Sequence, residues 1–489
     1  MRTIPSIGLA FRRVLPFSLA TLLLVSRQGL AEITLPDIGD PSGAVLSQVD
    51  EQALGEAFMR EIRAQLPVVD DPEIADYIES LGYGLASRGE AQNAGFHFFV
   101  IASPVINAFA APGGFIGINA GLIEASESES ELAAVMAHEI AHVTQRHLAR
   151  TIEFAQNMTL PALAGIIAAI ALGVAGGGQA GAAAAAALTA GQAQLQLNFS
   201  RSNEQEADRV GMQILYNAGY DPHAMPTFFE RLQQSQRYSG KLPEFLSTHP
   251  VTGSRISDSR NRAEQFPYRQ YVDSTQYQLV RAKLRVMAEQ DPERTVRYFE
   301  EMLKTEQPGA SLVTRYGYGL ALLEAGQPAR AREQLRTLSQ VDEDVQIPVQ
   351  VALARAELAL GNTGQALREY SEAQSLYPDN RALTHGYAEA LLRAGEPDKV
   401  LDLVNAYRRY HPLDAALYKM SAEAYARLGN RVESQIALAE HYYLAGQLEA
   451  AIEQMKLAMR MPETNFYRSA RIAARLQEFE REQTQRAER

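Results

Sequence analysis

The stretch HEIAH, residues 138–142, places two histidines four positions apart with a glutamate directly after the first. On a helix, residues four apart project onto the same side, so His138 and His142 could bind one zinc ion together. Glu139 would reach the edge of that site, where it could take a proton from a water activated by the metal and later deliver it to a leaving amine. Apolar neighbours surround both histidines, which argues against two solvated imidazoles because buried imidazoles need a partner.

A zinc ion at this position needs a third protein ligand, which has to come from elsewhere in the chain. His147 lies five residues past His142, about 140° around a continuous helix, so we expect it to be structural and not a ligand. The stretch NEQEADRVG, residues 203–211, is the better source. Glu204 and Asp208 would share one helical face, so Glu204 could bind zinc while Asp208 hydrogen-bonds a ligand imidazole, and Glu206 would point elsewhere. An amphipathic surface helix would explain the same charges.

The segment THPVTGSRI, residues 248–256, contains another histidine. Three roles are open for His249: it could stabilise the oxyanion of a tetrahedral intermediate, occupy the open metal position and silence the resting enzyme, or be structural. Arg255 is expected to hold this segment through charge-assisted hydrogen bonds.

Residues 96–125 are rich in β-branched and aromatic residues and are interrupted by Pro112-Gly113-Gly114. This pattern predicts a small sheet with a turn at the Pro-Gly-Gly. We expect the turn, with Gly113 and Gly114, and the following strand FIGIN to offer an exposed edge that binds the substrate as an added strand. Such binding reads the backbone, so broad specificity follows.

The first 31 residues have the pattern of a cleaved secretory signal, with a basic start, a short apolar run and small residues before position 32. An uncleaved membrane anchor is the alternative, but the apolar run of about a dozen residues is shorter than the ~20 needed to span a bilayer. Residues 32–50, rich in Pro, Gly and Asp, are expected to form an extended leader.

Composition limits the possible chemistry and partners. Cysteine is absent, so any metal must be held by His, Asp or Glu. The formal net charge is −12, and removal of residues 1–31, which carry four Arg and no acid, would bring it to −16. This acidity argues against nucleic acid as a partner and against electrostatic docking on anionic lipid.

Residues 154–200 contain no charged side chain and are dominated by Ala and Gly. A transmembrane hairpin, an apolar loop over the active site and a buried helix pair would each explain them. We favour a weakly packed lid that contacts the substrate or touches the membrane peripherally.

The second half of the chain repeats with a period of about 34 residues. Gly326, Gly361, Gly395 and Gly429 fall 35, 34 and 34 residues apart, each after an Ala/Leu-rich helix. This pattern is typical of the tetratricopeptide repeat, in which small residues let neighbouring helices pack closely. Gly446 follows after half a period, so one helix is expected to be shared between two partial repeats.

These patterns divide the chain into an α+β catalytic domain over residues 51–265, a linker over roughly 258–276, and an all-α tetratricopeptide-repeat solenoid over 277–489, which a degenerate unit around 277–308 opens.

Four motifs together resemble the zinc endopeptidase family that includes the CAAX prenyl proteases and the HtpX-type heat-shock proteases. They are His138-Glu139-x-x-His142, Glu204-x-x-Ala207-Asp208, NAFAAPGGFIGINAGL (107–122) and THPVTGSRI (248–256). The resemblance implies that His138, His142 and Glu204 bind zinc and that Glu139 is the general base. The chain departs from the prenyl proteases in lacking their many membrane spans.

With a signal and C-terminal repeats, the whole chain resembles a bacterial periplasmic branch of this family. The resemblance implies a zincin-like α+β metalloprotease domain, one Zn²⁺ per chain and a periplasmic location. It also implies unfolded or misassembled outer-membrane β-barrel proteins and their assembly machinery as partners. The alternative function is a chaperone or scaffold that acts through the repeat groove while the metal site is mostly silent.

Overall fold

The computed structural model describes residues 47–89, 95–154, 190–239, 244–267, 270–305, 312–338, 343–411, 413–463 and 465–487. The predicted signal and all but the last residues of the predicted leader lie outside the described residues. So does most of the uncharged segment, since its residues from 190 onward are the first turns of helix α8. In the part of the chain that is described, we find no helix whose length and hydropathy would allow it to cross a membrane.

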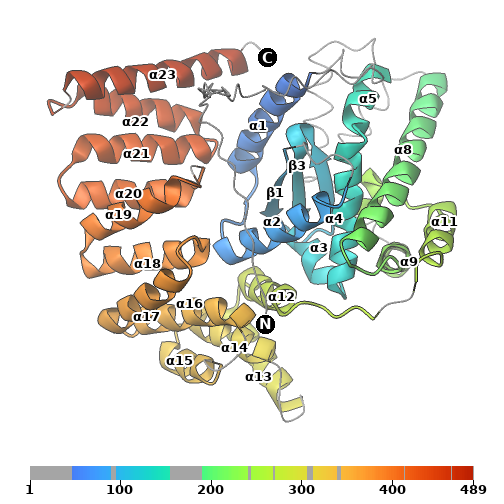
Figure 1. The fold of residues 1–489 in the computed structure, drawn as a ribbon, viewed down its shortest axis with the longest axis horizontal. Helices are drawn as coiled ribbons and strands as arrows, with labels where there is room; N and C mark the ends of the chain where they lie inside the picture. Colours follow the sequence, from blue (N-terminus) through green and yellow to red (C-terminus); the bar gives the residue numbers. More distant parts are fainter. Residues whose placement is uncertain are drawn as a thin grey trace, which may run out of the picture. The chain divides into compact units, whose positions relative to one another are not determined.

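The catalytic domain is a small sheet enclosed by helices (Figure 1). Its elements in chain order are α1 (Gln48–Gln65), α2 (Pro72–Ala86), β1 (His97–Ile101), β2 (Ala108–Ala111), the 3₁₀ turn η2 (Pro112–Gly114), β3 (Phe115–Asn119), α3 (Ala120–Ala125), α4 (Glu129–Thr144), α5 (His147–Phe154), α8 (Ala190–Asn217), α9 (Ala224–Ser239), α10 (Glu244–Thr248) and α11 (Gly253–Ala263).

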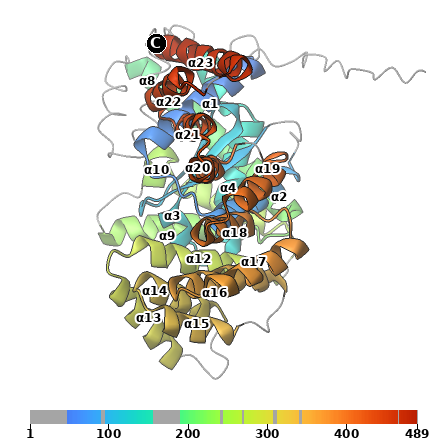
Figure 2. The same ribbon diagram turned by 90° about the vertical axis from the view of Figure 1, so that its left-hand side faces the viewer.

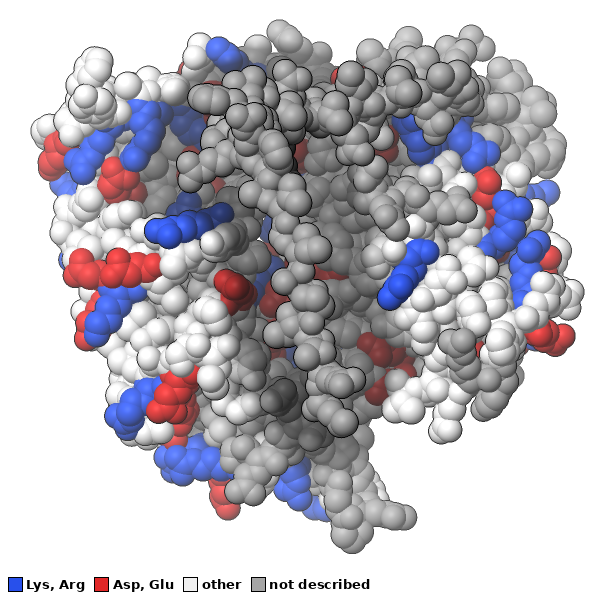
Figure 3. Space-filling model, viewed as in Figure 1, with Lys and Arg blue, Asp and Glu red and all other residues white. Residues whose placement is uncertain are grey.

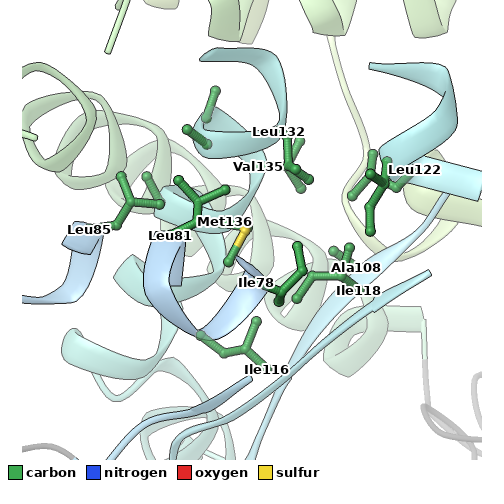
Figure 4. Packing of buried hydrophobic residues seen from close by; sticks show 14 of the residues in the cluster. Ile78, Leu81, Leu85, Ala108, Ile116, Ile118, Leu122, Leu132, Val135 and Met136 are labelled. Atoms are coloured by element: carbon green, nitrogen blue, oxygen red, sulfur yellow. The ribbon is translucent and has the colours of Figure 1, made fainter. Parts of the chain in front are cut away.

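The sheet has the strand order β1-β3-β2, with β1 parallel and β2 antiparallel to β3. Successive side chains of a strand point to opposite faces, and both faces are covered. Phe99 and Phe109 pack under α1, whereas Ile116 packs against α2 and α4. Figure 4 shows this second face, with Met136 of α4 among the side chains of α2 and of the strands. Burial on both faces explains the nearly continuous apolar runs in these strands.

The strand order corrects one expectation. The strand FIGIN is β3, which lies in the centre of the sheet and is buried at every position. A central strand has both edges hydrogen-bonded to neighbours, so the prediction that FIGIN offers a free edge is wrong. The outer edge of β1 is bridged by Val68 at Ile101, and β2 is the outer strand that packs beside α4.

Helix α4 begins after the capping residue Ser128 and ends abruptly. The Ser128 hydroxyl accepts a hydrogen bond from the Glu131 backbone, and the Glu131 carboxylate in turn accepts one from the Glu127 backbone. The helix ends at Thr144, and Arg146 then takes a left-handed conformation with φ of 51°. This reversal starts α5 in a new direction.

The tetratricopeptide repeats form the remaining helices, which Figures 1 and 2 show stacked in chain order. They are α12 (Thr275–Ala288), α13 (Pro292–Thr305), α14 (Leu312–Glu324), α15 (Pro328–Arg336), α16 (Glu343–Ala359), α17 (Thr363–Leu376), α18 (Arg381–Ala394), α19 (Pro397–Arg408), α20 (Ala415–Arg427), α21 (Arg431–Leu444), α22 (Leu448–Arg460) and α23 (Phe466–Ala487). As expected, a single helix, α21, fills the half period before Gly446 and packs against both α20 and α22.

The periodic glycines adopt backbone conformations that other residues rarely adopt. Gly361, Gly395 and Gly429 have φ values of 80°, 77° and 75°, which L side chains rarely adopt, and each follows the end of a helix. A Cβ at any of them would meet nothing within 4 Å, so close packing is not the reason for glycine there. Packing does explain the small residues within helices, since a Cβ at Gly319 would lie 2.6 Å from Leu335.

Helix α12 belongs to two hydrophobic cores at once. One face completes the catalytic core and the other begins the core of the first repeats. The buried side chains are Tyr277, Val280 and Leu284 on the first face, and Leu279, Ala282 and Val286 on the second. Because α11 continues to Ala263, the connection before α12 is shorter than the linker expected over 258–276.

A second contact between the repeats and the catalytic domain lies at the start of α2. The buried Lys283 ammonium is 2.7 Å from a carboxylate oxygen of both Asp71 and Glu73, and the Tyr316 hydroxyl donates to Glu73 at 2.9 Å. A cavity of about 400 Å³ opens beside this network between α2, α12 and α16, with Asp76 in its lining. This cavity is separate from the histidine residues of α4.

The far end of the repeats contacts α1. The Arg60 guanidinium forms an ion pair with Glu482 at 2.6 Å and lies over the Tyr443 ring. Gly446, with φ of 79°, lies directly against the backbone of Arg60, so that a Cβ there would overlap its carbonyl oxygen. Figure 2 shows α1 beside α22 and α23.

Acidic and basic side chains alternate on the surface. Figure 3 shows blue and red groups side by side over the repeat helices on the face that it displays. Pairs four residues apart on one helix, such as Glu389 with Arg393, contribute to this pattern.

Candidate metal centre

Helix α4 holds His138, Glu139 and His142 of the HEIAH motif inside the catalytic domain. His138 and Glu139 are completely buried, and the Nε2 atoms of His138 and His142 lie 3.0 Å apart. Both carboxylate oxygens of Glu139 are buried without a hydrogen-bond partner among the described residues. The predicted common side for the two imidazoles is therefore present, with an unsatisfied carboxylate beside it.

Helix α8 brings a carboxylate to the two imidazoles. Glu204 places Oε2 at 3.4 Å from His138 Nε2 and Oε1 at 3.4 Å from His142 Nε2. The approach of α8 depends on Gly211, where a Cβ would lie only 3.0 Å from the backbone nitrogen of His138. The role of Gly211 could have been suspected from its place two turns after Glu204, but the sequence does not show which helix it faces.

His249 completes the group. Its Nδ1 lies 3.1 Å from each oxygen of Glu204 and 3.3 Å from His138 Nε2. Its Nε2 lies 3.4 Å from Glu139 Oε1, so the ring spans from the cluster to the unsatisfied carboxylate. The ring stacks on Phe245 of α10 with centroids 4.8 Å apart.

The distances within this group fit a metal ion. His138, His142, Glu204 and His249 each offer one donor atom, and the four atoms lie within 4.8 Å of one another. The separations given above, 3.0–3.4 Å, match the edge of about 3.3 Å that a tetrahedron with zinc–nitrogen distances near 2.0 Å would have. Imidazole and carboxylate donors suit zinc, and the chain has no thiol to compete.

The electrostatics of the cluster favour a cation. Burial alone would raise the pKa of Glu204, but His249 and a hydrogen bond with His138 hold it well below its ordinary value. Burial lowers the pKa of His142 far below that of a free imidazole, which leaves its ring neutral. His138 is also buried, yet hydrogen bonds with Asp208 and Glu204 raise its pKa to about 9. The negative charge that draws a proton to His138 would equally attract a metal ion.

Asp208 and Arg255 lie beside the cluster. Asp208 Oδ1 lies 3.1 Å from His138 Nδ1, on the side of the ring away from the cluster. The Arg255 guanidinium donates two hydrogen bonds to Asp208, at 2.7 and 2.8 Å, and lies 3.0 Å from Glu204 Oε2. Arg255 also donates to the Pro250 carbonyl at 2.9 Å, so it holds the segment that carries His249.

His147 lies closer to the cluster than the sequence indicated. It is outside the group of four donors, as expected, but its Nδ1 lies 2.9 Å from His142 Nδ1. The expected position of His147, about 140° around the helix from His142, is wrong because the helix does not continue. Arg146 reverses the chain and returns His147 toward α4. Glu206, expected to point elsewhere, faces His147 at 3.2 Å. The local sequence pattern did not indicate that either residue lies beside the site.

Gly113 and Gly114 lie against other parts of the domain. Both have positive φ, at 70° and 76°, which favours glycine at this turn. A Cβ at Gly113 would lie 3.1 Å from the Gln52 backbone of α1, and one at Gly114 would overlap the backbone of Gly95. The structure thus gives these glycines a role in forming the turn, and their contact with a substrate stays a prediction.

Comparisons with known proteins agree with this arrangement. Residues 72–263 match the model of peptidase family M48, and residues 223–412 match a tetratricopeptide-repeat model. The chain is 35% identical over 446 residues to the beta-barrel assembly-enhancing protease of Escherichia coli, covering 91% of each chain. It is 34% identical over 456 residues to the protein of that name in Yersinia pestis, covering 93% of each.

A relative with a different name matches over a shorter part of the chain. The mitochondrial metalloendopeptidase OMA1 of Schizosaccharomyces pombe is 36% identical over 157 residues, which are 32% of this chain and 43% of that protein. The chain is a metallopeptidase of family M48 and belongs to the family of the beta-barrel assembly-enhancing proteases, with tetratricopeptide repeats after its catalytic domain.

Proposed function

We propose that this protein is a zinc-dependent endopeptidase in which His138, His142 and Glu204 hold one zinc ion per chain. The observation that carries the proposal is that donors from two helices lie within 3.0–3.4 Å of one another, although His138 and Glu204 are 66 positions apart in the sequence. The unsatisfied carboxylate of Glu139 beside them supports a general base at this place.

The residues of the chain divide the catalytic work. Bound zinc supplies Lewis acidity, which makes water a better nucleophile and stabilises negative charge on the scissile carbonyl. Glu139 accepts the proton of the attacking water and then donates it to the leaving amine. The Asp208 carboxylate, 3.1 Å from the outer nitrogen of His138, orients this ring, and Arg255 holds Asp208 in place.

His249 is proposed to keep the resting enzyme closed. Its Nδ1 lies among the donor atoms, 3.3 Å from His138 Nε2 and 3.1 Å from the Glu204 carboxylate, where it would compete with a water for a bound metal. A gating residue and an oxyanion-stabilising residue give opposite results on removal. The variant His249→Ala should cleave an unfolded substrate faster than the parent if His249 blocks the site, and about 10²- to 10³-fold slower if it stabilises the oxyanion. Turnover measured at saturating zinc distinguishes the two roles.

We propose the periplasm as the location and misassembled outer-membrane β-barrel proteins as the substrates, together with assistance to the machinery that assembles them. The names of the Escherichia coli and Yersinia pestis relatives support this assignment, since both are described as enhancing β-barrel assembly. The predicted signal over residues 1–31 supports export. The repeats supply the surface on which a client or the assembly machinery would bind.

A chaperone or scaffold is the second candidate function. The placement of His249 within the donor cluster favours it, because a metal centre closed by this residue would cleave little while the repeats remain available for binding. The two functions need not exclude each other, and one variant separates them.

The test is the variant Glu139→Gln, with Glu449→Gln on the exposed face of α22 as the control. Glu139→Gln should bind zinc normally and degrade casein about 10²- to 10⁴-fold more slowly, whereas the control should degrade it at the parental rate. Parental casein degradation by Glu139→Gln at matched zinc would overturn the protease mechanism. Cells that carry only Glu139→Gln and still assemble β-barrel proteins would establish scaffolding as a separate activity.

A further inference from the structure

The outer nitrogen of His142 has a partner that the proposed mechanism leaves unused. Its Nε2 faces the donor cluster, with His138 Nε2 at 3.0 Å and Glu204 Oε1 at 3.4 Å. Its Nδ1, on the other side of the ring, lies 2.9 Å from His147 Nδ1. His147 is 3% exposed, so this contact is shielded from water.

The contact continues to a carboxylate. His147 Nε2 lies 3.2 Å from Glu206 Oε2, and the Arg150 guanidinium donates to the same oxygen at 2.8 Å. Glu206 comes from α8, the helix that also carries Glu204. The arrangement exists because the chain reverses at Arg146, which brings the first residue of α5 back against the last turns of α4.

The hydrogen-bonding capacity of imidazole fixes the direction of this chain. A neutral imidazole that binds a metal through Nε2 carries its proton on Nδ1 and must donate it to an acceptor. Here the only nitrogen facing His142 Nδ1 in the described structure is His147 Nδ1, so His147 accepts there and carries its own proton on Nε2. That proton is donated to Glu206, which is the acceptor at the end of the chain.

We propose that His147 and Glu206 are positioning residues that hold His142 in the tautomer and orientation required to bind the metal. This inference rests on the proposed metal site, in which His142 is a ligand. The other imidazole ligand has the shorter version of the same device: His138 Nδ1 contacts the Asp208 carboxylate directly, and Arg255 fixes that carboxylate. The His142 branch inserts one imidazole between ligand and carboxylate.

A purely structural role for His147 predicts different behaviour. A buried histidine that bonds α4 to α5 and α8 would stabilise the fold equally with and without metal. A positioning role predicts a loss specific to metal binding, since outer-shell partners typically change metal affinity by about 10- to 100-fold.

The experiment measures the zinc dissociation constant of the full chain by competition with a chromophoric chelator, and the melting temperature of the zinc-free protein. The variants are His147→Ala, His147→Asn and Glu206→Gln. Asparagine can place its carbonyl oxygen near the former Nδ1 position and so accept the His142 proton. The matched control is His223→Ala, which removes another histidine paired with a carboxylate, Asp221, at 3.0 Å on a more exposed part of the domain.

We expect zinc binding to weaken by about 10- to 100-fold in His147→Ala and to recover partly in His147→Asn. Glu206→Gln should weaken it by a smaller factor, and His223→Ala should leave it unchanged. Zinc affinities of His147→Ala and Glu206→Gln that both stay within about threefold of the parent would overturn the positioning role. Glu206 is partly exposed, so its variant should fold even if His147→Ala does not. A parent that binds no zinc would overturn the metal site itself, and with it this inference.

Discussion

Gly211 offers a direct test of how the two metal-binding helices are held together. A Cβ at this position would lie 3.0 Å from the His138 backbone nitrogen and 3.1 Å from the carbonyl group of Ala137. Ordinary contacts between carbon atoms are 3.5–4.0 Å, so alanine would push α8 away from α4 by about 0.5 Å. Helix backbone cannot yield locally, and Glu204 moves with α8.

Gly84 in α2 provides the matched comparison, because a Cβ there meets nothing within 4 Å. Gly→Ala within a helix stabilises a protein by about 1 kcal/mol when space permits, and this is the expectation for Gly84→Ala. Gly211→Ala has the same helical gain, but overpacking opposes it by about 1–3 kcal/mol. The net change for Gly211→Ala is therefore a loss of up to about 2 kcal/mol.

The assay compares melting temperatures of the two zinc-free variants and their casein turnover at matched zinc. Gly84→Ala should melt above the parent and turn over casein normally. Gly211→Ala should melt at or below the parent and turn over casein about tenfold more slowly, since a displacement of 1 Å can reduce a rate by about 10²-fold. If Gly211→Ala gains as much stability as Gly84→Ala and keeps its turnover, close approach at Gly211 does not position Glu204.

Three further predictions concern the contacts between the repeats and the catalytic domain. Burial raises the pKa of Asp76 to about 6, so ionisation of this carboxyl opposes folding above that pH. Asp76→Asn should therefore raise the melting temperature at pH 7–8, with a gain of at most about 3 kcal/mol in the free energy of unfolding. The difference from the parent should vanish by about pH 4. Lys283→Met leaves the buried carboxylate of Glu73 without its cation and should reduce stability by about 3–5 kcal/mol in denaturant unfolding, whereas an unchanged midpoint would show that the ion pairs contribute nothing. Gly446→Ala should lower the melting temperature more than Gly429→Ala, because both have positive φ but only the first would also collide with α1; equal losses would mean that this end of the repeats is not held there.

The parts of the site that follow helical periodicity could be predicted from the sequence. The common side of His138 and His142 requires only that the segment be helical, and the capping residue Ser128 marked where the helix begins. The convergence of Glu204 and His249 with these histidines could not be obtained from local pattern, because 62 and 107 residues separate them from His142. Helical spacing offers Glu204 as a candidate ligand, but only the motifs shared with a known family connect Glu204 and His249 with the two histidines.

The incorrect expectations have a common physical origin. The angle assigned to His147 assumed a continuous helix, and nothing in the local sequence marks Arg146, which is not glycine, as a residue of positive φ. The edge role given to FIGIN required the order of strands, which is set by tertiary packing and not by the composition of one strand. The closeness of α8 to α4 at Gly211 likewise depends on the assembled domain.

Helix α12 determines how this protein could be divided. A catalytic fragment that ended before Thr275 would lack three side chains of its own core and leave an apolar depression open to water. A repeat fragment that started after Ala288 would expose the apolar surface of the first repeats that α12 covers in the full chain. Both fragments need the same fourteen residues, so neither is a self-sufficient module. Recombination or proteolytic cleavage on either side of this helix would leave one part prone to aggregation.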